Sequence, residues 1–131
     1  MNNNLKSILI VDDSNITRNL IEHVYNSKYN VVTAVNGKEA VNYINTVNID
    51  TVAAILLDLN MPEVDGFEVL DNFKERGILS KVPVCIITGE EAPEIIGKVK
   101  TYDVAAILLK PFSTSQIEDV VSKAIEIRKN N

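Results

Sequence analysis

Three aspartates, a threonine and a lysine stand where short apolar runs of this sequence end. Asp12 and Asp13 follow the run SILIV, and Asp58 closes the run VAAILL. Thr88 ends the run VCIIT, and Lys110 follows AAILL. A carboxylate that is buried without a partner is costly, so each aspartate at the end of a buried run needs a partner or a function.

These residue types suit one kind of chemistry when they lie close together. Close carboxylates repel one another, so they either take up protons or gather cations. Lys110 offers one cation, and a divalent metal ion would be another. Oxygen ligands without histidine or cysteine favour Mg²⁺ or Mn²⁺ over zinc. A carboxylate nucleophile, a metal ion, an ammonium group and the hydroxyl of Thr88 together suit phosphoryl transfer.

Five apolar runs predict the strands that must position these residues. The runs are Ser7–Val11, Val31–Val35, Val52–Leu57, Val84–Thr88 and Ala105–Leu109. Four of them are almost continuously apolar, which is typical of central strands in a parallel sheet that is covered on both faces. The run at 31–35 is interrupted by Thr33, which indicates an edge strand.

Segments with helical spacing of apolar residues alternate with these runs. Ser14 is the predicted N-cap of the first helix, and the Asn36–Gly37 turn precedes the second. The third ends near Gly77, and the last begins near Ser113–Ser115. The fourth, Glu94–Tyr102, contains a glycine and is expected to be short or mobile. This alternation predicts an α/β fold of the (βα)5 type, a doubly wound five-stranded parallel sheet whose site lies beyond the carboxyl ends of the strands.

Length and composition place the chain in a broad class. The 131 residues fit a single domain, 1–131, with 46% hydrophobic and 24% charged residues. The net charge of -5 argues against binding of nucleic acid by this segment. No apolar run approaches the roughly 20 residues of a membrane span, and an aspartate pair follows the N-terminus too soon for a signal peptide. The single cysteine, Cys85, is expected to be buried and inert. We therefore expect a cytoplasmic domain.

The stretches IVDD, LLDLNMPEVDG, IIT and LLKPF, in this order and spacing, resemble the receiver domain of two-component response regulators, the chemotaxis regulators among them. The resemblance covers the chain from about Lys6 to Ile127. Each motif alone is weakly specific, whereas the five positions at four strand ends form a specific set. The resemblance implies the flavodoxin-like receiver fold with strand order 2-1-3-4-5.

The resemblance also implies a phosphorylation site with a bound metal ion. Asp58 would be the phosphoacceptor and would take a phosphoryl group from a phosphohistidine or a small acyl phosphate. Asp13, Asp58 and the backbone carbonyl of Asn60 would bind Mg²⁺, for which Mn²⁺ could substitute. Asp12 would assist through water. On this view the domain is not an enzyme and catalyses only its own phosphorylation and dephosphorylation.

Other positions have implied roles in signalling. Lys110 would pair with the phosphoryl oxygens, and its bond to Pro111 would be cis. Thr88 would move toward the phosphoryl group and carry the signal into the fourth helix. Gly66 would allow the loop after Asp58 to turn. Ile107 departs from the family pattern, which has Tyr or Phe at this position, three residues before the lysine.

The implied partners are a sensor histidine kinase or a histidine phosphotransfer protein, followed by a protein target or an output domain. Activation would change the face made of helix 4, strand 5 and helix 5, and could produce a homodimer. The order of the segment Glu90–Tyr102 is expected to depend on phosphorylation. The residues themselves leave the signal, the cognate kinase, the output and the oligomeric state open.

Three other functions are compatible with parts of the pattern. A Mg²⁺-dependent phosphatase with an aspartyl nucleophile would use similar chemistry, but it usually has its two acidic residues spaced two apart after one strand. A receiver-like interaction module that is never phosphorylated would be expected to lack some of the five site residues. A flavin-binding module would have a glycine-rich loop after the first strand, where this chain has Asp12 and Asp13.

Overall fold

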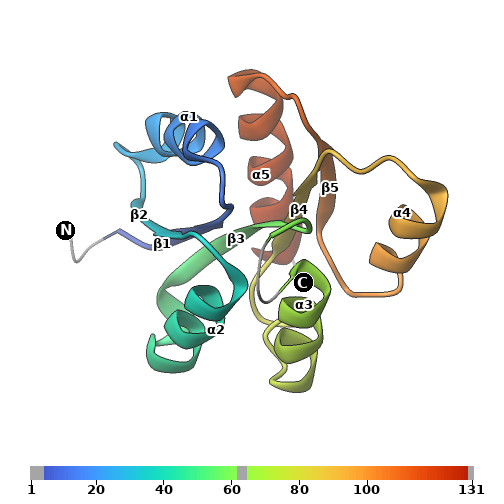
Figure 1. Ribbon diagram of the computed structural model, residues 1–131. Helices are drawn as coiled ribbons and strands as arrows, with labels where there is room; N and C mark the ends of the chain where they lie inside the picture. Colours follow the sequence, from blue (N-terminus) through green and yellow to red (C-terminus); the bar gives the residue numbers. More distant parts are fainter. Residues whose placement is uncertain (1–4, 62–64, 130–131) are drawn as a thin grey trace.

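The computed structural model describes residues 5–61 and 65–129. Five parallel strands form one sheet in the order β2-β1-β3-β4-β5, as the resemblance implied (Figure 1). The strands are β1 (Ser7–Val11), β2 (Asn30–Ala34), β3 (Val52–Asp58), β4 (Val84–Thr88) and β5 (Ala106–Leu109). The chain crosses from β2 over β1 to β3, so β1 and β3 are neighbours in the middle of the sheet.

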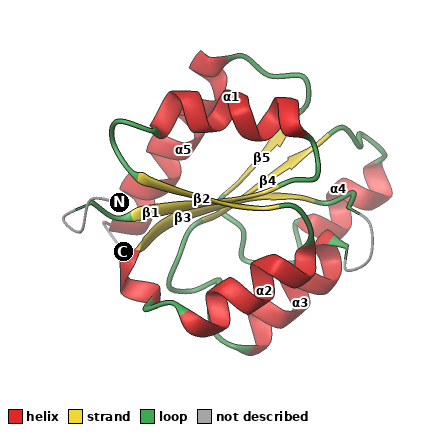
Figure 2. Cartoon of the chain, turned by 60° about the vertical axis from the view of Figure 1, so that its left-hand side comes forward, coloured by secondary structure: helices red, strands yellow, loops and turns green. Residues whose placement is uncertain are grey.

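Five α-helices cover the two faces of this sheet. They are α1 (Asn15–Tyr25), α2 (Gly37–Thr46), α3 (Gly66–Glu75), α4 (Pro93–Val99) and α5 (Thr114–Lys129), and a short 3-10 helix, Ile49–Thr51, precedes β3. Figure 2 shows α1 and α5 on one face of the sheet and α2 and α3 on the other. Val99 of α4 packs into the same core as α2 and α3. The predicted (βα)5 architecture is therefore confirmed.

Alternating side chains of the strands build two cores. In β1, Ile8 and Ile10 pack against α1 and α5, whereas Leu9 and Val11 pack against α2 and α3. The reason is the two-residue period of a strand, which sends successive side chains to opposite faces. Because helices cover both faces, a strand in the middle of the sheet is apolar at every position.

Two predictions about strands and helices need correction. The apolar run at 105–109 was expected to form a central strand, yet β5 lies at the edge of the sheet and its side chains are only partly buried. A strand at the edge keeps an apolar sequence when helices cover both of its faces. Composition alone therefore did not distinguish an edge strand from a central one. The fourth helix ends at Val99 instead of Tyr102, and Pro93 occupies its first turn.

Most other bounds agree with the sequence to within one residue. Ser14 caps α1 as predicted, and its hydroxyl accepts the N–H of Thr17. The predicted edge strand lies at 30–34 instead of 31–35, and β3 extends by one residue to include Asp58. Cys85 is fully buried, and this burial raises the pKa of its thiol to about 12. An inert thiol was the expectation.

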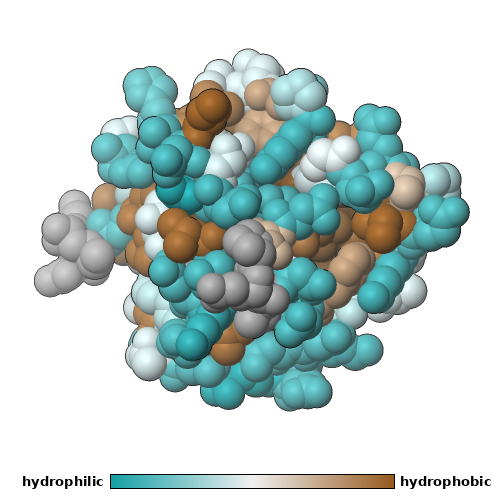
Figure 3. Space-filling model, viewed as in Figure 1, coloured by the Kyte–Doolittle hydropathy of each residue, from teal (hydrophilic) through white to brown (hydrophobic). Residues whose placement is uncertain are grey.

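The surface is mostly hydrophilic with separate hydrophobic patches in the view of Figure 3. Four large apolar side chains are exposed among the described residues: Ile16, Val35, Leu109 and Ile127. Of these, Ile16 is the most exposed, at 83%. His23 is also exposed. None of the helices in the described ranges is both long and apolar enough to cross a membrane.

Candidate functional site

The turn from β1 into α1 places two aspartates at the carboxyl edge of the sheet. Asp12 is fully buried, whereas Asp13 is exposed. The Oδ1 atom of Asp12 accepts the backbone N–H of Ser14 at 2.8 Å. Because Ser14 also caps α1, the helix begins directly after the aspartate pair and fixes the turn that carries it.

Asp58 reaches the same place from β3. The register pairs Val11 with Leu57, so the next residues along the two parallel strands, Asp12 and Asp58, come side by side. Asp58 is only 4% exposed. Its Oδ1 atom accepts the backbone N–H of Asn60 at 3.2 Å, which holds the carboxylate against the start of the following loop.

The loop after Asp58 ends at Gly66, the first residue of α3. The backbone N–H of Gly66 donates to the carbonyl of Leu59 at 3.0 Å. A Cβ atom at position 66 would lie 2.5 Å from Cα of Leu59 and 2.8 Å from the carbonyl oxygen of Asp58. The glycine is therefore needed for close approach of two backbone segments. Residues 62–64 of the LLDLNMPEVDG motif lie outside the described residues.

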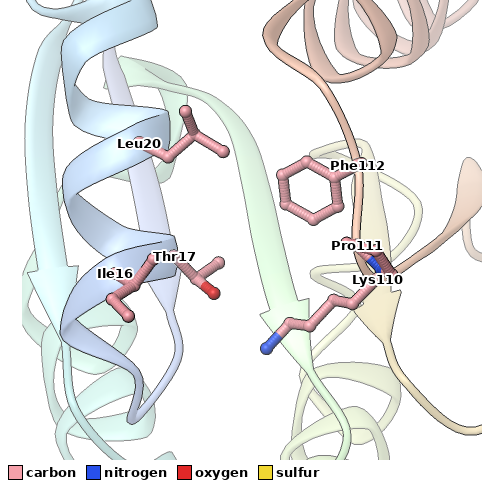
Figure 4. Close-up of a pocket in the computed structure, with 6 residues that line it drawn as sticks. All are labelled: Ile16, Thr17, Leu20, Lys110, Pro111 and Phe112. Carbon is pink, nitrogen blue, oxygen red and sulfur yellow. The ribbon is translucent and has the colours of Figure 1, made fainter.

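Lys110 brings a cation to this edge from the end of β5. Its Nζ atom lies 2.7 Å from Oδ2 of Asp12 and 3.4 Å from Oδ2 of Asp58. Figure 4 shows the lysine side chain extending from the end of β5 toward β3. The Lys110–Pro111 peptide bond is cis, as the resemblance implied. The cation that the sequence offered is thus shared by two of the three carboxylates.

The electrostatics of the site reflect crowded charge. Burial raises the pKa of Asp58, and the neighbouring charge of Asp12 raises it further, while Lys110 and the Asn60 N–H act in the opposite direction. Burial alone would lower the pKa of Lys110, but the hydrogen bond to Asp12 and the charges of both aspartates outweigh it and raise the pKa. The lysine therefore stays charged, and the site disfavours a charged Asp58 unless more positive charge arrives.

The carboxylates lie close enough together to share a metal ion. One oxygen from each of Asp12, Asp13 and Asp58 lies within 4.8 Å of the others. This donor set consists of hard oxygen atoms with an exposed member, Asp13, on the solvent side. Such a set fits Mg²⁺, which binds one or two carboxylates and keeps several waters. Asn60 follows directly, but its carbonyl as a ligand stays a prediction.

Thr88 ends β4, next to the strand that carries Asp58. The residue is fully buried, and its hydroxyl accepts the backbone N–H of Glu90 at 3.0 Å. This bond shapes the turn that leads from β4 to α4. Ile107 of β5 pairs with Ile86 of β4 and is partly buried against the core under α2 and α3. The described structure thus gathers the three aspartates and Lys110, and places Thr88 at the adjacent strand end.

Arg18 is a site residue that sequence reasoning missed. Its Nη1 atom donates to the backbone carbonyl of Asp12 at 2.7 Å, and Nη2 donates to the side chain of Asn15. The guanidinium therefore ties the first turn of α1 to the Asp12–Asp13 peptide. The signal in the sequence was an arginine one turn into the helix after an aspartate pair, where its side chain can reach back to the turn.

An apolar groove lies beside Lys110. It has a volume of about 450 Å³ and is lined by Ile16, Thr17, Leu20, Lys110, Pro111 and Phe112. Figure 4 shows α1 on one side of this groove and the segment after β5 on the other. The charged side chain of Lys110 and the exposed apolar side chain of Ile16 thus line the same groove.

Comparison with known proteins agrees with this geometry. The profile of the response regulator receiver domain matches residues 8–122. The two-component response regulator ARR17 of Arabidopsis thaliana is 32% identical over 131 residues, which cover 92% of this chain and 86% of the relative. The chemotaxis protein CheY4 of Vibrio cholerae has a TM-score of 0.79 at 26% identity, covering 92% of this chain and 98% of that chain. A CheY-like receiver domain from Methanospirillum hungatei has a TM-score of 0.84 at 21% identity, covering 96% and 98%, which shows the fold alone. The chain belongs to the response regulator receiver domains of two-component signalling.

Proposed function

We propose that this receiver domain is switched by phosphorylation of Asp58. The observation that carries the proposal is the arrangement of Asp12, Asp13 and Asp58 within 4.8 Å, with Lys110 paired to two of them. A carboxylate that is crowded by like charge gains stability when cations gather around it. A phosphoryl group brings oxygens that Lys110 and a metal ion can bind together.

The transfer step is a displacement at phosphorus. A carboxylate oxygen of Asp58 attacks the phosphoryl group of a phosphohistidine, the P–N bond breaks, and the imidazole leaves with its electron pair and takes up a proton. Lys110 pairs with the phosphoryl oxygens once the group is in place. In the later return step water attacks the same phosphorus, the P–O bond to Asp58 breaks, inorganic phosphate leaves, and the Asp58 carboxylate is restored. The domain then catalyses only its own phosphorylation and dephosphorylation.

Mg²⁺ is the metal ion that the donor set fits. We propose that Asp13, Asp58 and the Asn60 carbonyl hold it, with Mn²⁺ as a substitute, while Asp12 assists through water. When bound, Mg²⁺ supplies positive charge that offsets the negative charge on the phosphoryl oxygens. Asp13, which is exposed, would bind the ion on its solvent side, and Asp12, which is buried, would assist from the protein interior.

The switch is proposed to reach the surface through Thr88. Its hydroxyl now accepts the N–H of Glu90, so turning toward a phosphoryl group on Asp58 would release the turn that leads into α4. The face formed by α4, β5 and α5 would then change and control a protein target or an output domain, alone or as a homodimer. Asp58 would receive its phosphoryl group in the cytoplasm.

The donor is proposed to be a sensor histidine kinase or a histidine phosphotransfer protein. The apolar groove between α1 and the segment after β5 supports this, because it borders Lys110 and offers the 83%-exposed Ile16 to a protein surface. A small acyl phosphate needs no such surface. Substitution Ile16→Asp should therefore slow transfer from a phosphorylated phosphotransfer protein and leave the reaction with acetyl phosphate unchanged.

The first experiment measures phosphorylation directly. The protein is incubated with acetyl phosphate and Mg²⁺, and its intact mass is compared with that of Asp58→Asn. One added phosphoryl group, lost in the variant and in the absence of the metal ion, would support the proposal. No addition from acetyl phosphate or from sensor kinases would contradict it and favour a constitutive interaction module. Hydrolysis of many equivalents of a phosphate ester would favour a phosphatase.

A further inference from the structure

Helix α4 is the least anchored helix of the fold. Its seven residues lack a side-chain N-cap, and Gly97 lies in its interior. The other four helices each pack closely along a strand or another helix, whereas α4 does not within the described ranges. Figure 1 shows it standing apart beyond β5. Its core contacts come mainly from the buried Val99 and the partly buried Ile95.

Side chains link this helix and the turn after it to α3. The Nζ atom of Lys98 lies 4.2 Å from the centre of the Phe67 ring. The hydroxyl of Tyr102 donates to Oδ1 of Asp71 at 2.5 Å, and the ring centres of Phe67 and Tyr102 are 6.2 Å apart. Lysine over an aromatic face and a phenol bonded to a carboxylate are both attractive contacts. We call Phe67, Asp71, Lys98 and Tyr102 the α3–α4 cluster.

The hydroxyl of Tyr102 is a donor in this cluster. The hydrogen bond to Asp71 raises the pKa of Tyr102 to about 12, and partial burial contributes to the same shift. The phenol therefore keeps the proton that it donates. The Nζ atom of Lys74 lies over the Tyr102 ring, 5.9 Å from its centre.

Phe67 is also attached to the loop that follows Asp58. It is the residue directly after Gly66, whose N–H donates to Leu59 and whose backbone lies against that of Asp58. A second groove, of about 540 Å³, is lined by Asp13 and Asn60 as well as by Phe67 and Ile95. The loop at Leu59 and the first turn of α3 are therefore linked by a hydrogen bond and by close backbone contact.

We propose that Phe67 is a positioning residue that couples the site at Asp58 to helix α4 through the α3–α4 cluster. This rests on the proposed phosphorylation of Asp58. Binding of a phosphoryl group and a metal ion would draw in the loop at Leu59, the start of α3 would follow, and Phe67 would change its contact with Lys98. The route uses α3 and does not depend on the side chain at position 107.

The test compares amide hydrogen exchange of residues 93–99 before and after treatment with acetyl phosphate and Mg²⁺. Intact mass on the same samples reports the phosphorylated fraction. We expect phosphorylation to change exchange in this segment of the wild-type protein. In Lys98→Met and in Phe67→Ala, Asp58 should still be phosphorylated, but the change in exchange should shrink by about twofold or more.

Matched variants separate coupling from a merely structural role. Lys98→Arg keeps a cation over the Phe67 ring and should restore the wild-type response. Lys100→Met removes an exposed lysine at the end of α4 and should leave the response unchanged. A purely structural contact would alter exchange in α4 equally with and without phosphorylation, and that result would overturn the proposal.

Failure of the proposal and failure of the proposed function give different results. Wild-type protein that gains no phosphoryl group would overturn the function and with it the coupling. Wild-type and Lys98→Met proteins that gain the group to the same extent and respond identically in α4 would overturn the coupling alone. Tyr102→Phe supplies an independent second variant, because it removes the bond to Asp71 and keeps the ring beside Phe67.

Discussion

Lys110 lies closer to Asp12 than to Asp58: its Nζ atom is 2.7 Å from Oδ2 of the first and 3.4 Å from Oδ2 of the second. A single ammonium therefore offsets two buried carboxylates of the acidic cluster. A metal ion bound to the same carboxylates would compete with that ammonium for negative charge. A phosphoryl group on Asp58 would give Lys110 new oxygens to bind. The position of this cation thus links metal binding to phosphorylation.

Removal of the lysine charge should have opposite effects on folding and on metal binding. Lys110→Met leaves Asp12 and Asp58 buried without their cation, so the metal-free protein should lose about 1–3 kcal/mol of unfolding free energy. The same variant should bind Mg²⁺ more tightly, because a competing positive charge is gone. Urea unfolding in EDTA and calorimetric titration with Mg²⁺ measure the two effects.

The chain offers a matched control for this variant. Lys123→Met removes an exposed pair with Asp119, whose charged atoms are 3.1 Å apart. Because exposed pairs on a helix contribute little, stability should change by about 0.5 kcal/mol or less and Mg²⁺ affinity should not change. Weaker Mg²⁺ binding in Lys110→Met would show that the lysine organises the metal ligands instead of competing with the ion.

Asp58→Asn should stabilise the metal-free protein at neutral pH. Burial and the charge of Asp12 raise the pKa of Asp58 in the folded state. The folded state then holds its proton more tightly than the unfolded chain, so wild-type stability falls as the pH rises from the ordinary aspartate pKa through the raised one. Asparagine does not titrate. The unfolding free energy of the variant should therefore increasingly exceed that of the wild type as the pH rises through this window, and the two should be equal below it.

Unfolding curves at several pH values in EDTA test this prediction. The difference in unfolding free energy between variant and wild type should be largest at neutral pH and smallest in acid. Mg²⁺ should narrow the difference, because the ion stabilises the charged carboxylate of the wild type. An Asn variant that is less stable than wild type at neutral pH without metal would mean that the pairing of Asp58 with Lys110 outweighs its burial.

The sequence pattern predicted that the site residues stand at strand ends, on one edge of the sheet. Asp12 and Lys110 follow apolar strands and Asp58 ends one, and the carboxyl ends of parallel strands lie at one edge of the sheet. Strand periodicity and turn residues are local properties, so they can be predicted from the amino-acid sequence. The neighbouring positions of β1 and β3 came from the family resemblance, since no spacing specifies the order of strands.

Features that depend on side-chain direction were not predictable in the same way. The contact of Arg18 with the Asp12 carbonyl requires the guanidinium to turn back toward the β1–α1 turn. The contact between Lys98 and Phe67 joins two helices whose mutual position no local pattern encodes. Gly66 was predicted to matter for a turn, but the structure shows that it matters for lack of space beside Leu59.

Arg18 should support metal binding without contacting the metal site directly. Its guanidinium holds the Asp12 carbonyl at 2.7 Å, and the next residue is the proposed ligand Asp13. Arg18→Gln should therefore weaken Mg²⁺ binding by about tenfold, the lower end of what supporting residues contribute. Arg18→Lys keeps one donor and should recover part of the affinity. Calorimetric titration gives the dissociation constants.

The control for Arg18 is an arginine far from the site in the chain. Arg76 is exposed at the end of α3, and Arg76→Gln removes the same charge. Its Mg²⁺ affinity should equal that of the wild type. An equal loss of Mg²⁺ affinity in both variants would mean that net charge, instead of the contact with Asp12, explains the effect of Arg18.

Gly66 should tolerate no side chain, whereas Gly97 should. A Cβ atom at position 66 would stand 2.5 Å from Cα of Leu59, while one at position 97 would meet nothing within 4 Å. Gly66→Ala should cost about 1–3 kcal/mol of unfolding free energy, because the backbones must separate. Gly97→Ala should add about 0.5–1 kcal/mol, because alanine favours a helix interior over glycine.

The two glycine variants also separate stability from function. Gly66→Ala pushes the loop at Leu59 away from the start of α3, so it should weaken Mg²⁺ binding beyond its effect on unfolding. Gly97→Ala lies in α4, away from the carboxylates, and should bind Mg²⁺ as the wild type does. Wild-type metal affinity in a folded Gly66→Ala protein would show that the close approach of Gly66 serves folding alone. Weakened affinity in that protein alone would show that the same contact also positions the carboxylate of Asp58.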